Sequence, residues 1–354
     1  MAGRSAIGLD IGTSGVRAAE VSVSKGRLTL ERFGQVALPE GAVSDGEVID
    51  QPAVAKAIKE LWAHTRFSSK KVVLGVANQK VVVRQVDLPW LPPDELKAGL
   101  AFQVQDYLPM PVDEAVLDFY VLDEITDTAG ARLLRGLLVA AVREMVLSSV
   151  QAVRKAGLRP TMVDLTSFAV LRSLAPRDEL GMTTGVEAIV DVGARVTNIV
   201  IHEAGVPRFV RILLLGGQDV TEAVATRMGV PITQAETLKQ EQSREGAELT
   251  VGLAPVSRVV EAASAPLIDE VRGSLDYYRA STGAAPITRL VLSGGGALLA
   301  GLGERLAAAT RIPIAAGNPF QPLSLGRTGL APEQLDFVQP LAAVPVGLAL
   351  GALS

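Results

Sequence analysis

The sequence predicts an α/β protein of two related domains, with a small α+β insert in the first domain. Three observations support this fold class. A βββα pattern with an aspartate-glycine turn occurs at Asp10 and occurs again at Asp191. The segment 88–160 interrupts the first copy with a different pattern of helices and strands. The chain has 354 residues, which is long enough for two hydrophobic cores.

The composition excludes several classes of protein. Apolar residues make up 48% of the chain and the net charge is −4, so the clustered basic surface of a nucleic-acid-binding protein is not expected. The absence of cysteine excludes disulfides and thiolate metal sites. The N-terminus lacks the apolar region of a signal peptide, and no uncharged apolar run reaches about 18 residues. We therefore expect a soluble, cytoplasmic protein whose apolar C-terminal segment forms a last buried helix.

The first elements are strands at residues 6–10, 16–23 and 27–33. The turns between them are too short for a helical crossover, so these strands must be antiparallel. A helix is predicted at 51–66, followed by buried strands at 71–77 and 80–89. The glycine turn after Asp10 thus lies between two strands. A P-loop or a Rossmann loop lies between a strand and a helix, so both of those nucleotide folds are excluded.

The insert is predicted to contain two helices and two strands. A helix over 91–108 would place Leu96, Leu100, Val104 and Leu108 on one face. Strands are expected at 117–125 and 132–142, and a second helix over 143–157 with Gly157 as its C-terminal cap. This pattern is compatible with a βααβ or an αββα unit of small-domain size.

The second half repeats the first. Strands are predicted at 187–193, 196–205 and 207–215, followed by a helix at 219–229. The polar segment 237–252 is expected to be a helix and then a loop. Residues 287–310 predict a strand, a turn of three glycines and a helix. An internal repeat at this scale implies two similar domains that face each other.

The repeated turns have the chemistry of a phosphate site. Glycines allow backbone N–H groups to approach phosphate oxygens closely, and the aspartates suit Mg²⁺. A third glycine turn, at residues 294–296, could receive an adenosine or a phosphate. Each loop alone is better explained as a turn that needs glycine, and each aspartate alone as a turn residue. Three such turns, two of them in repeat register, favour a nucleotide held between the domains.

The segments GLDIGTSGVRAAE, IVDVGARVTNIVI and LVLSGGGALLAGL resemble the phosphate-1, phosphate-2 and adenosine motifs of the actin-like ATPase superfamily. The resemblance implies an actin-like (ribonuclease H-like) two-domain fold that binds ATP with Mg²⁺ between its halves. The implied metal ligands are Asp10 and Asp191. The implied nucleotide contacts are Asp10, Gly12, Thr13, Ser14, Arg17, Asp191, Gly193, Thr197, Gly216, Gly217, Glu236, Lys239, Gly294, Gly295 and Gly296.

Within this superfamily the insert, including YLPMP and the strands around it, resembles that of the PilM family of type IV pilus assembly proteins. The resemblance implies a cytoplasmic scaffold, peripheral to the inner membrane, whose insert binds the N-terminal cytoplasmic peptide of PilN. Other inner-platform or motor proteins are further implied partners. The implied divisions are 1–87 for the first domain, 88–160 for the insert and 161–188 for a return to the first domain. Residues 189–333 are the second domain, with a peripheral part near 230–275, and 334–354 return to the first.

Two positions depart from the superfamily pattern. Arg17 stands where relatives often have lysine, and it keeps the positive charge. Thr166 stands where a carboxylate or glutamine usually positions the attacking water, and threonine cannot act as a carboxylate base. Asp164 could replace it only if its strand were shifted. We therefore predict that ATP binds and is hydrolysed slowly or not at all.

Two other functions remain open at this stage. A small-molecule kinase of the same fold would need a carboxylate base and a polar substrate pocket, whereas the insert is apolar and rich in helix. A membrane-tethered division protein like FtsA would need a basic amphipathic C-terminal helix. The segment PVGLALGALS contains no basic residue.

Overall fold

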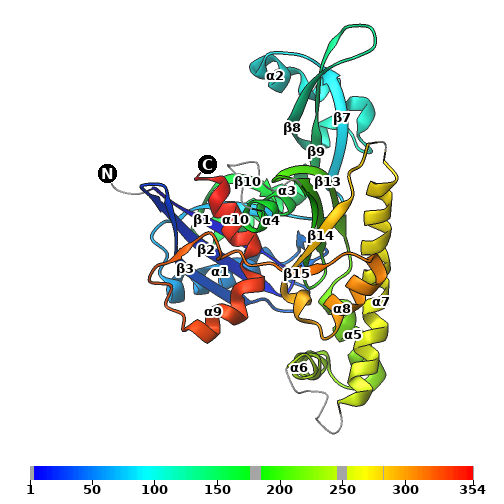
Figure 1. The fold of residues 1–354 in the computed structure, drawn as a ribbon. Coiled ribbons are helices and arrows are strands. Elements are labelled where there is room, and N and C mark those ends of the chain that lie inside the picture. Colours follow the sequence, from blue (N-terminus) through cyan, green and yellow to red (C-terminus); the bar gives the residue numbers. More distant parts are fainter. Residues whose placement is uncertain (1–3, 176–184, 245–252, 282, 354) are drawn as a thin grey trace.

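The computed structural model describes residues 4–175, 185–244, 253–281 and 283–353. Two mixed sheets form the centres of two domains, and a three-stranded sheet stands apart from them at one end of the molecule (Figure 1). The helices among these residues cover the sheets. The arrangement confirms an α/β architecture with two related domains and an insert.

The first domain is built on a six-stranded sheet with the order β10-β6-β1-β2-β3-β16. Its strands are β1 (Arg4–Ile11), β2 (Gly15–Ser24), β3 (Arg27–Ala37), β6 (Lys71–Val76), β10 (Arg159–Leu165) and β16 (Ser324–Leu325). β1, β2 and β3 pair antiparallel, as their short turns predict. β6 pairs parallel to β1 after the crossover through a helix, which confirms the predicted βββαβ order. A small hairpin, β4 (Val43–Ser44) with β5 (Glu47–Val48), precedes that helix.

Helices α1 (Gln51–Thr65), α3 (Arg143–Lys155), α4 (Thr166–Leu174) and α10 (Ala343–Gly351) pack on this domain, and α9 (Pro332–Val338) precedes α10. Asp50 caps α1 by accepting a hydrogen bond from the Ala53 N–H at 2.9 Å. α10 is apolar and buried, which confirms the predicted last helix. It lies so close to α4 that a side chain at Gly347 would collide with the Ala169 carbonyl oxygen. α4 is thereby held between α10 and the second domain.

The second domain repeats the plan with a five-stranded sheet, ordered β13-β12-β11-β14-β15. Its strands are β11 (Val186–Val192), β12 (Thr197–Glu203), β13 (Val206–Leu213), β14 (Ile287–Ser293) and β15 (Ile314–Ala316). Its helices are α5 (Gly217–Met228), α6 (Ile232–Gln242), α7 (Ala254–Arg279) and α8 (Leu302–Thr310). The predicted polar helix corresponds to the end of α6, and the loop expected at 245–252 lies outside the described residues.

The insert contains β7 (Val82–Pro89), α2 (Pro93–Gln103), β8 (Ala115–Thr126) and β9 (Arg132–Val142), with single 3-10 turns at Gln105–Tyr107 and Val112–Glu114. From α2 through α3 the order is αββα, one of the two predicted arrangements. The predicted helix over 91–108 is too long, because α2 ends at Gln103. Leu96, Leu100 and Val104 are core residues beneath the sheet.

The assignment of segments to the insert differs from the expected division at residue 88. β7 pairs with β9, so the sheet of the insert begins at Val82. At the other end, Ala152 and Val153 of α3 belong to the core of the first domain together with α1. α3 therefore contributes to the core of the first domain. The domain boundaries stay a prediction.

Candidate functional site

The two aspartate-glycine turns occupy equivalent positions in the two sheets. In the first hairpin Asp10 pairs with Arg17, and in the second Asp191 pairs with Asn198. Each turn is closed by its glycine: the Gly12 N–H donates to the Gly15 carbonyl and the Gly193 N–H donates to the Val196 carbonyl, both at 3.0 Å. The repeat seen in the sequence is therefore a repeat of hydrogen-bonded geometry.

The two turns bring Asp10 and Asp191 into one electrostatic environment. Burial, and next the charge of Asp10, raise the pKa of Asp191 to about 7, although hydrogen bonds from Ser293 and Asn198 oppose the shift. Burial also raises the pKa of Asp10, and the guanidinium of Arg17 at 3.8 Å opposes this. A buried carboxylate whose pKa is raised by the charge of a second carboxylate is in an unfavourable position unless a cation or a proton neutralises it.

Arg17 has hydrogen-bonding capacity to spare at this position. Its Nη2 donates to the Ser14 hydroxyl at 3.2 Å. Among the described residues its buried Nε–H finds no acceptor. Buried donors are normally satisfied, so an unpaired guanidinium N–H on β2, beside a glycine turn, is typical of a site for an anionic ligand.

The turn at Gly193, the start of α5 and the turn at 294–296 meet in space. A Cβ atom added at Gly217, the first residue of α5, would lie 3.8 Å from the Gly193 oxygen and 3.9 Å from the Gly296 Cα. Gly294 has φ +85°, and any side chain there would collide with the Val192 backbone. Glycine is thus required by the fold at Gly294, and also at Gly216, where an added Cβ would lie 2.4 Å from the Gly193 oxygen. The turn at 294–296 continues as a short 3-10 helix, and α8 begins only at Leu302.

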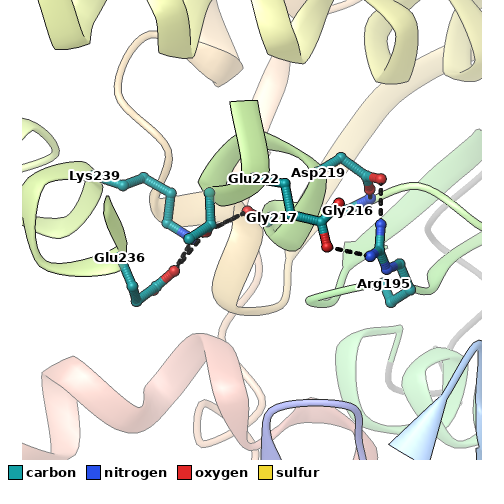
Figure 2. Close-up of polar contacts among 8 residues, drawn as sticks. Arg195, Gly216, Gly217, Asp219, Glu222, Glu236 and Lys239 are labelled. Carbon is teal, nitrogen blue, oxygen red and sulfur yellow. Dashed lines mark hydrogen bonds and ion pairs between the residues drawn. The ribbon is translucent and has the colours of Figure 1, made fainter. Parts of the chain in front are cut away.

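An arginine in the second turn holds the start of α5 (Figure 2). Arg195 binds Asp219 at 2.6 Å and also binds Glu222. Asp219 in turn accepts the Gly216 N–H at 2.8 Å. Backbone bonds from Gly217 to Gly193, 3.0 Å, and from Gln218 to Ala194, 2.7 Å, join the same two segments. Arg195 was missing from the sequence prediction, because nothing in its own segment reveals the acidic partners on α5.

Glu236 and Lys239 meet α5 from the neighbouring helix α6. Lys239 donates to the Thr221 hydroxyl at 2.8 Å and to the Gly217 carbonyl at 3.1 Å, and binds Glu236 at 2.7 Å (Figure 2). Burial would raise the pKa of Glu236, but Lys239 and the Thr221 hydrogen bond outweigh it and lower the pKa. The predicted pair is therefore next to the glycine turns, and Thr221 is a further member that the sequence did not reveal.

Thr197 has a different immediate partner from the one the motif implies. It is fully buried, and its hydroxyl donates to the Leu215 carbonyl at 2.7 Å. This bond fixes the approach of the chain to Gly216. A contact between Thr197 and a phosphate stays a prediction.

The arrangement fits a metal-bound polyphosphate better than a metal ion alone. Among the described residues no group of three or more His, Cys, Asp or Glu side chains could hold a metal. Asp10 and Asp191 therefore supply two carboxylates at most. Mg²⁺ commonly takes one or two carboxylates and completes its coordination with water and substrate phosphates. The free N–H of Arg17 and the glycine turns suit those phosphates.

Comparisons with known proteins identify the family. The sequence model described as "Type IV pilus assembly protein PilM" matches residues 8–353, almost the whole chain. The chain belongs to the PilM family. The solved "PilM-PilN type IV pilus biogenesis complex" has a chain that superposes with a TM-score of 0.85 and 29% identity, over 99% of this chain and 98% of that one.

More distant relatives define the wider fold. MreB 5 of Spiroplasma citri, solved with AMPPNP bound, superposes with a TM-score of 0.55 at 11% identity over 98% of this chain and 95% of that chain, which shows the actin-like fold alone. The cell division protein FtsA of Bacillus subtilis is 23% identical over 259 residues, 66% of this chain and 57% of that protein. This chain thus spans less than two thirds of that curated relative. The predicted actin-like fold class is confirmed.

Thr166, which departs from the superfamily pattern, is hydrogen-bonded to the second domain in this PilM-family chain. Thr166 is the first residue of α4 and is buried, with its hydroxyl donating to Asn198 Oδ1 at 3.1 Å. Asp164 forms an ion pair with Arg172 of α4. Arg172 also donates to the Gly347 carbonyl at 3.1 Å. Asp164 is thus engaged in holding α4 in place.

Five exposed apolar side chains lie on the elements at which the insert meets the first domain in this PilM-family chain. They are Val116 and Tyr120 of β8, Leu147 of α3, and Met162 and Val163 of β10, and we refer to this set as the junction surface. Arg143, one turn before Leu147, donates to the Ala115 carbonyl at 2.8 Å and so joins α3 to the start of β8. No helix among the described residues is both long and apolar enough to cross a membrane.

Proposed function

We propose that this chain is an ATP-binding scaffold of type IV pilus assembly that binds the N-terminal cytoplasmic segment of a PilN-type membrane protein. The observation that carries the proposal is the superposition on a chain of the PilM–PilN complex over nearly the full length of both chains. Through such a partner the protein would be peripheral to the inner membrane and remain in the cytoplasm.

The junction surface is the proposed docking site for the partner segment. β8 and β10 are edge strands of their sheets, so each has one side free for a further strand. Exposed apolar side chains beside a free strand edge are typical of sites where an extended peptide adds to a sheet. The alternative face, on α2, is less suitable because Leu96, Leu100 and Val104 are already buried in the insert.

The nucleotide part of the proposal rests on the converging glycine turns. Asp10 and Asp191 would hold Mg²⁺, and Arg17 with the turns at Gly12 and Gly193 would bind phosphates. Gly217, Lys239 and the turn at 294–296 would border the nucleoside. When bound, Mg²⁺ would neutralise phosphate and carboxylate charge. The chain itself orients the ligand, and slow or absent hydrolysis is expected because Thr166 supplies no base.

Point substitutions at the junction surface test the partner assignment. Deleting residues 88–157 would remove the α3 side chains Ala152 and Val153 from the first-domain core, so it would unfold the protein. Instead, Tyr120→Ser and Met162→Ser should each weaken binding of a fluorescent PilN N-terminal peptide at least tenfold by anisotropy. Phe102→Ser is the matched control, because Phe102 is 86% exposed on α2. Equal affinity of all three variants and the unmodified protein would refute the proposed site.

A further inference from the structure

A buried asparagine connects the carboxylate pair to a helix of the other domain. Asn198 lies on β12 in the second domain, opposite Asp191 in the hairpin register, and is 4% exposed. Its Oδ1 accepts hydrogen bonds from Ser167 at 2.8 Å and from Thr166 at 3.1 Å, both on α4 of the first domain. The contact therefore crosses between the domains beside the proposed nucleotide site.

The two hydroxyls fix the orientation of the Asn198 amide. An amide oxygen that accepts two hydrogen bonds leaves the NH₂ group to point the other way, and Asn198 donates to the Asp191 carboxylate. An aspartate at this position could accept from both hydroxyls but could not donate to Asp191. The residue type thus makes a continuous link from the carboxylate to the first turn of α4.

The next residue of α4 reaches the junction surface. The ring of Phe168 lies 5.9 Å from the ring of Tyr120, which is 41% exposed on β8. α4 has little freedom to deform, because α10 packs closely against it. At Gly347 of α10 there is no room for a side chain beside the Ala169 carbonyl oxygen of α4. A displacement of the first turn of α4 would therefore move Phe168 against Tyr120.

We propose that Asn198 is a positioning residue that couples occupancy of the carboxylate pair to partner binding at the junction surface. The inference rests on the proposed function and adds a regulation to it. A cation on Asp191 competes with the Asn198 NH₂ group for the carboxylate oxygens. Asn198 then adopts a second arrangement, which changes its bonds to Ser167 and Thr166 and shifts the start of α4. Coupling between the two sites is reciprocal, so the peptide changes nucleotide affinity by the same factor.

Peptide affinity with and without Mg-ATP tests the coupling. In the unmodified protein, saturating Mg-ATP should change the Kd of the fluorescent PilN peptide by about fivefold or more, the lower range of measured couplings. In Asn198→Ala and in Ser167→Ala the change should fall below twofold. Ser173→Ala is the control, because Ser173 is a fully buried α4 hydroxyl whose bond goes to the Val170 carbonyl within the helix.

The outcomes separate this inference from the proposed function. If the unmodified protein binds both ligands with no change in Kd, or if both variants keep the full change, the coupling through Asn198 is wrong and the scaffold proposal stands. If neither ATP nor peptide binds the unmodified protein, the proposed function is wrong and the coupling is wrong with it. Ser167→Ala keeps the test decisive if Asn198→Ala does not fold, since it removes the shorter of the two hydrogen bonds that join α4 to Asn198.

Discussion

Asp10 and Asp191 stand at the same position of two repeated hairpins, one in each domain, and burial together with the charge of Asp10 raises the pKa of Asp191 to about 7. The fold thus places two carboxylates where their charges repel. Carboxylates with a raised pKa are typical of functional sites, so we infer that this pair serves a ligand that neutralises its charge.

The first prediction concerns pH. Because the folded pKa of Asp191 lies above its ordinary value of 3.8, the folded state retains a proton that the unfolded state has lost. The free energy of unfolding should therefore fall as pH rises from about 4 to about 7, by at most about 4 kcal/mol. Asp191→Asn should remove this fall, so its Tm should exceed that of the unmodified protein at pH 8 without Mg²⁺. Thermal melts across this pH range measure the effect.

Asp87→Asn is a control, because the contribution of Asp87 to stability should depend on pH in the opposite direction from that of Asp191. A hydrogen bond from Arg135 lowers the pKa of Asp87, so its stabilising contribution is present above its ordinary pKa and is lost as pH falls. That variant should be less stable than the unmodified protein at pH 8. If Asp191→Asn shows the same Tm difference at pH 5 and pH 8, the carboxylate pair does not behave as described.

The second prediction concerns the space between the glycine turns. A methyl group at Gly217 would make ordinary contacts, the nearest being Lys239 Nζ at 3.6 Å, so Gly217→Ala should fold with unchanged or slightly raised stability. The methyl group would occupy the space proposed for the nucleotide and cost about 1–3 kcal/mol of overpacking there. ATP affinity should therefore fall about tenfold or more in calorimetry.

Gly273→Ala provides the matched control on α7, where an added Cβ would meet no atom within 4 Å. It should gain about 0.5–1 kcal/mol of stability from helix propensity and leave ATP affinity unchanged. Unaltered ATP affinity in Gly217→Ala would place the ligand elsewhere.

The third prediction concerns the ion pairs at the start of α5. Arg195→Ala would leave Asp219 and Glu222 without their cation next to a proposed polyphosphate site. We expect a stability loss of about 1–2 kcal/mol, since these partly exposed charged hydrogen bonds are lost together, and a several-fold weaker affinity for ATP. Restoration of ATP affinity in the double variant Arg195→Ala/Glu222→Gln would identify charge as the cause.

Arg272→Ala removes an exposed pair on α7, Arg272 with Asp269 at 3.0 Å, and should change stability by only about 0.3 kcal/mol. Denaturant titration and calorimetry on the two arginine variants distinguish a local role of Arg195 from a general effect of charge. A stability loss as small as that of Arg272→Ala would contradict the role of Arg195 in holding α5.

The sequence was sufficient for the features that depend on local order. Turn length alone dictates antiparallel β1, β2 and β3, and the repeat places Asp10 and Asp191 in equivalent turns. The 26-residue helix α7 was missed although its buried positions, such as Val256, Val260 and Val271, have helical spacing. Pro266 lies inside α7, and a proline within a helical pattern normally indicates a break, so the sequence does not predict one continuous helix.

The features that the sequence does not predict depend on contacts between segments that are distant along the chain. β7 was placed in the first domain because its sequence follows β6 directly, but its pairing with β9 is set by tertiary structure. Arg195 and Asn198 are ordinary polar residues in the sequence. Their roles arise only when α5 and α4 are folded against the second hairpin, which no local pattern encodes.

The last prediction concerns hydrolysis. Thr166 donates its hydroxyl to Asn198, and Asp164 is paired with Arg172, so neither is available as a carboxylate base. Asp10 and Asp191 are proposed to hold the cation. The other acids described beside the site, Asp219, Glu222 and Glu236, are paired with Arg195 or Lys239. Loss of a positioned base commonly lowers rates by about 10²–10⁴. Phosphate release with saturating Mg-ATP should therefore not exceed that of Asp10→Asn, and chromatography should recover bound ATP intact. Multiple turnovers abolished by Asp10→Asn would show instead that another group orients the attacking water, and the ATP would then be consumed rather than held.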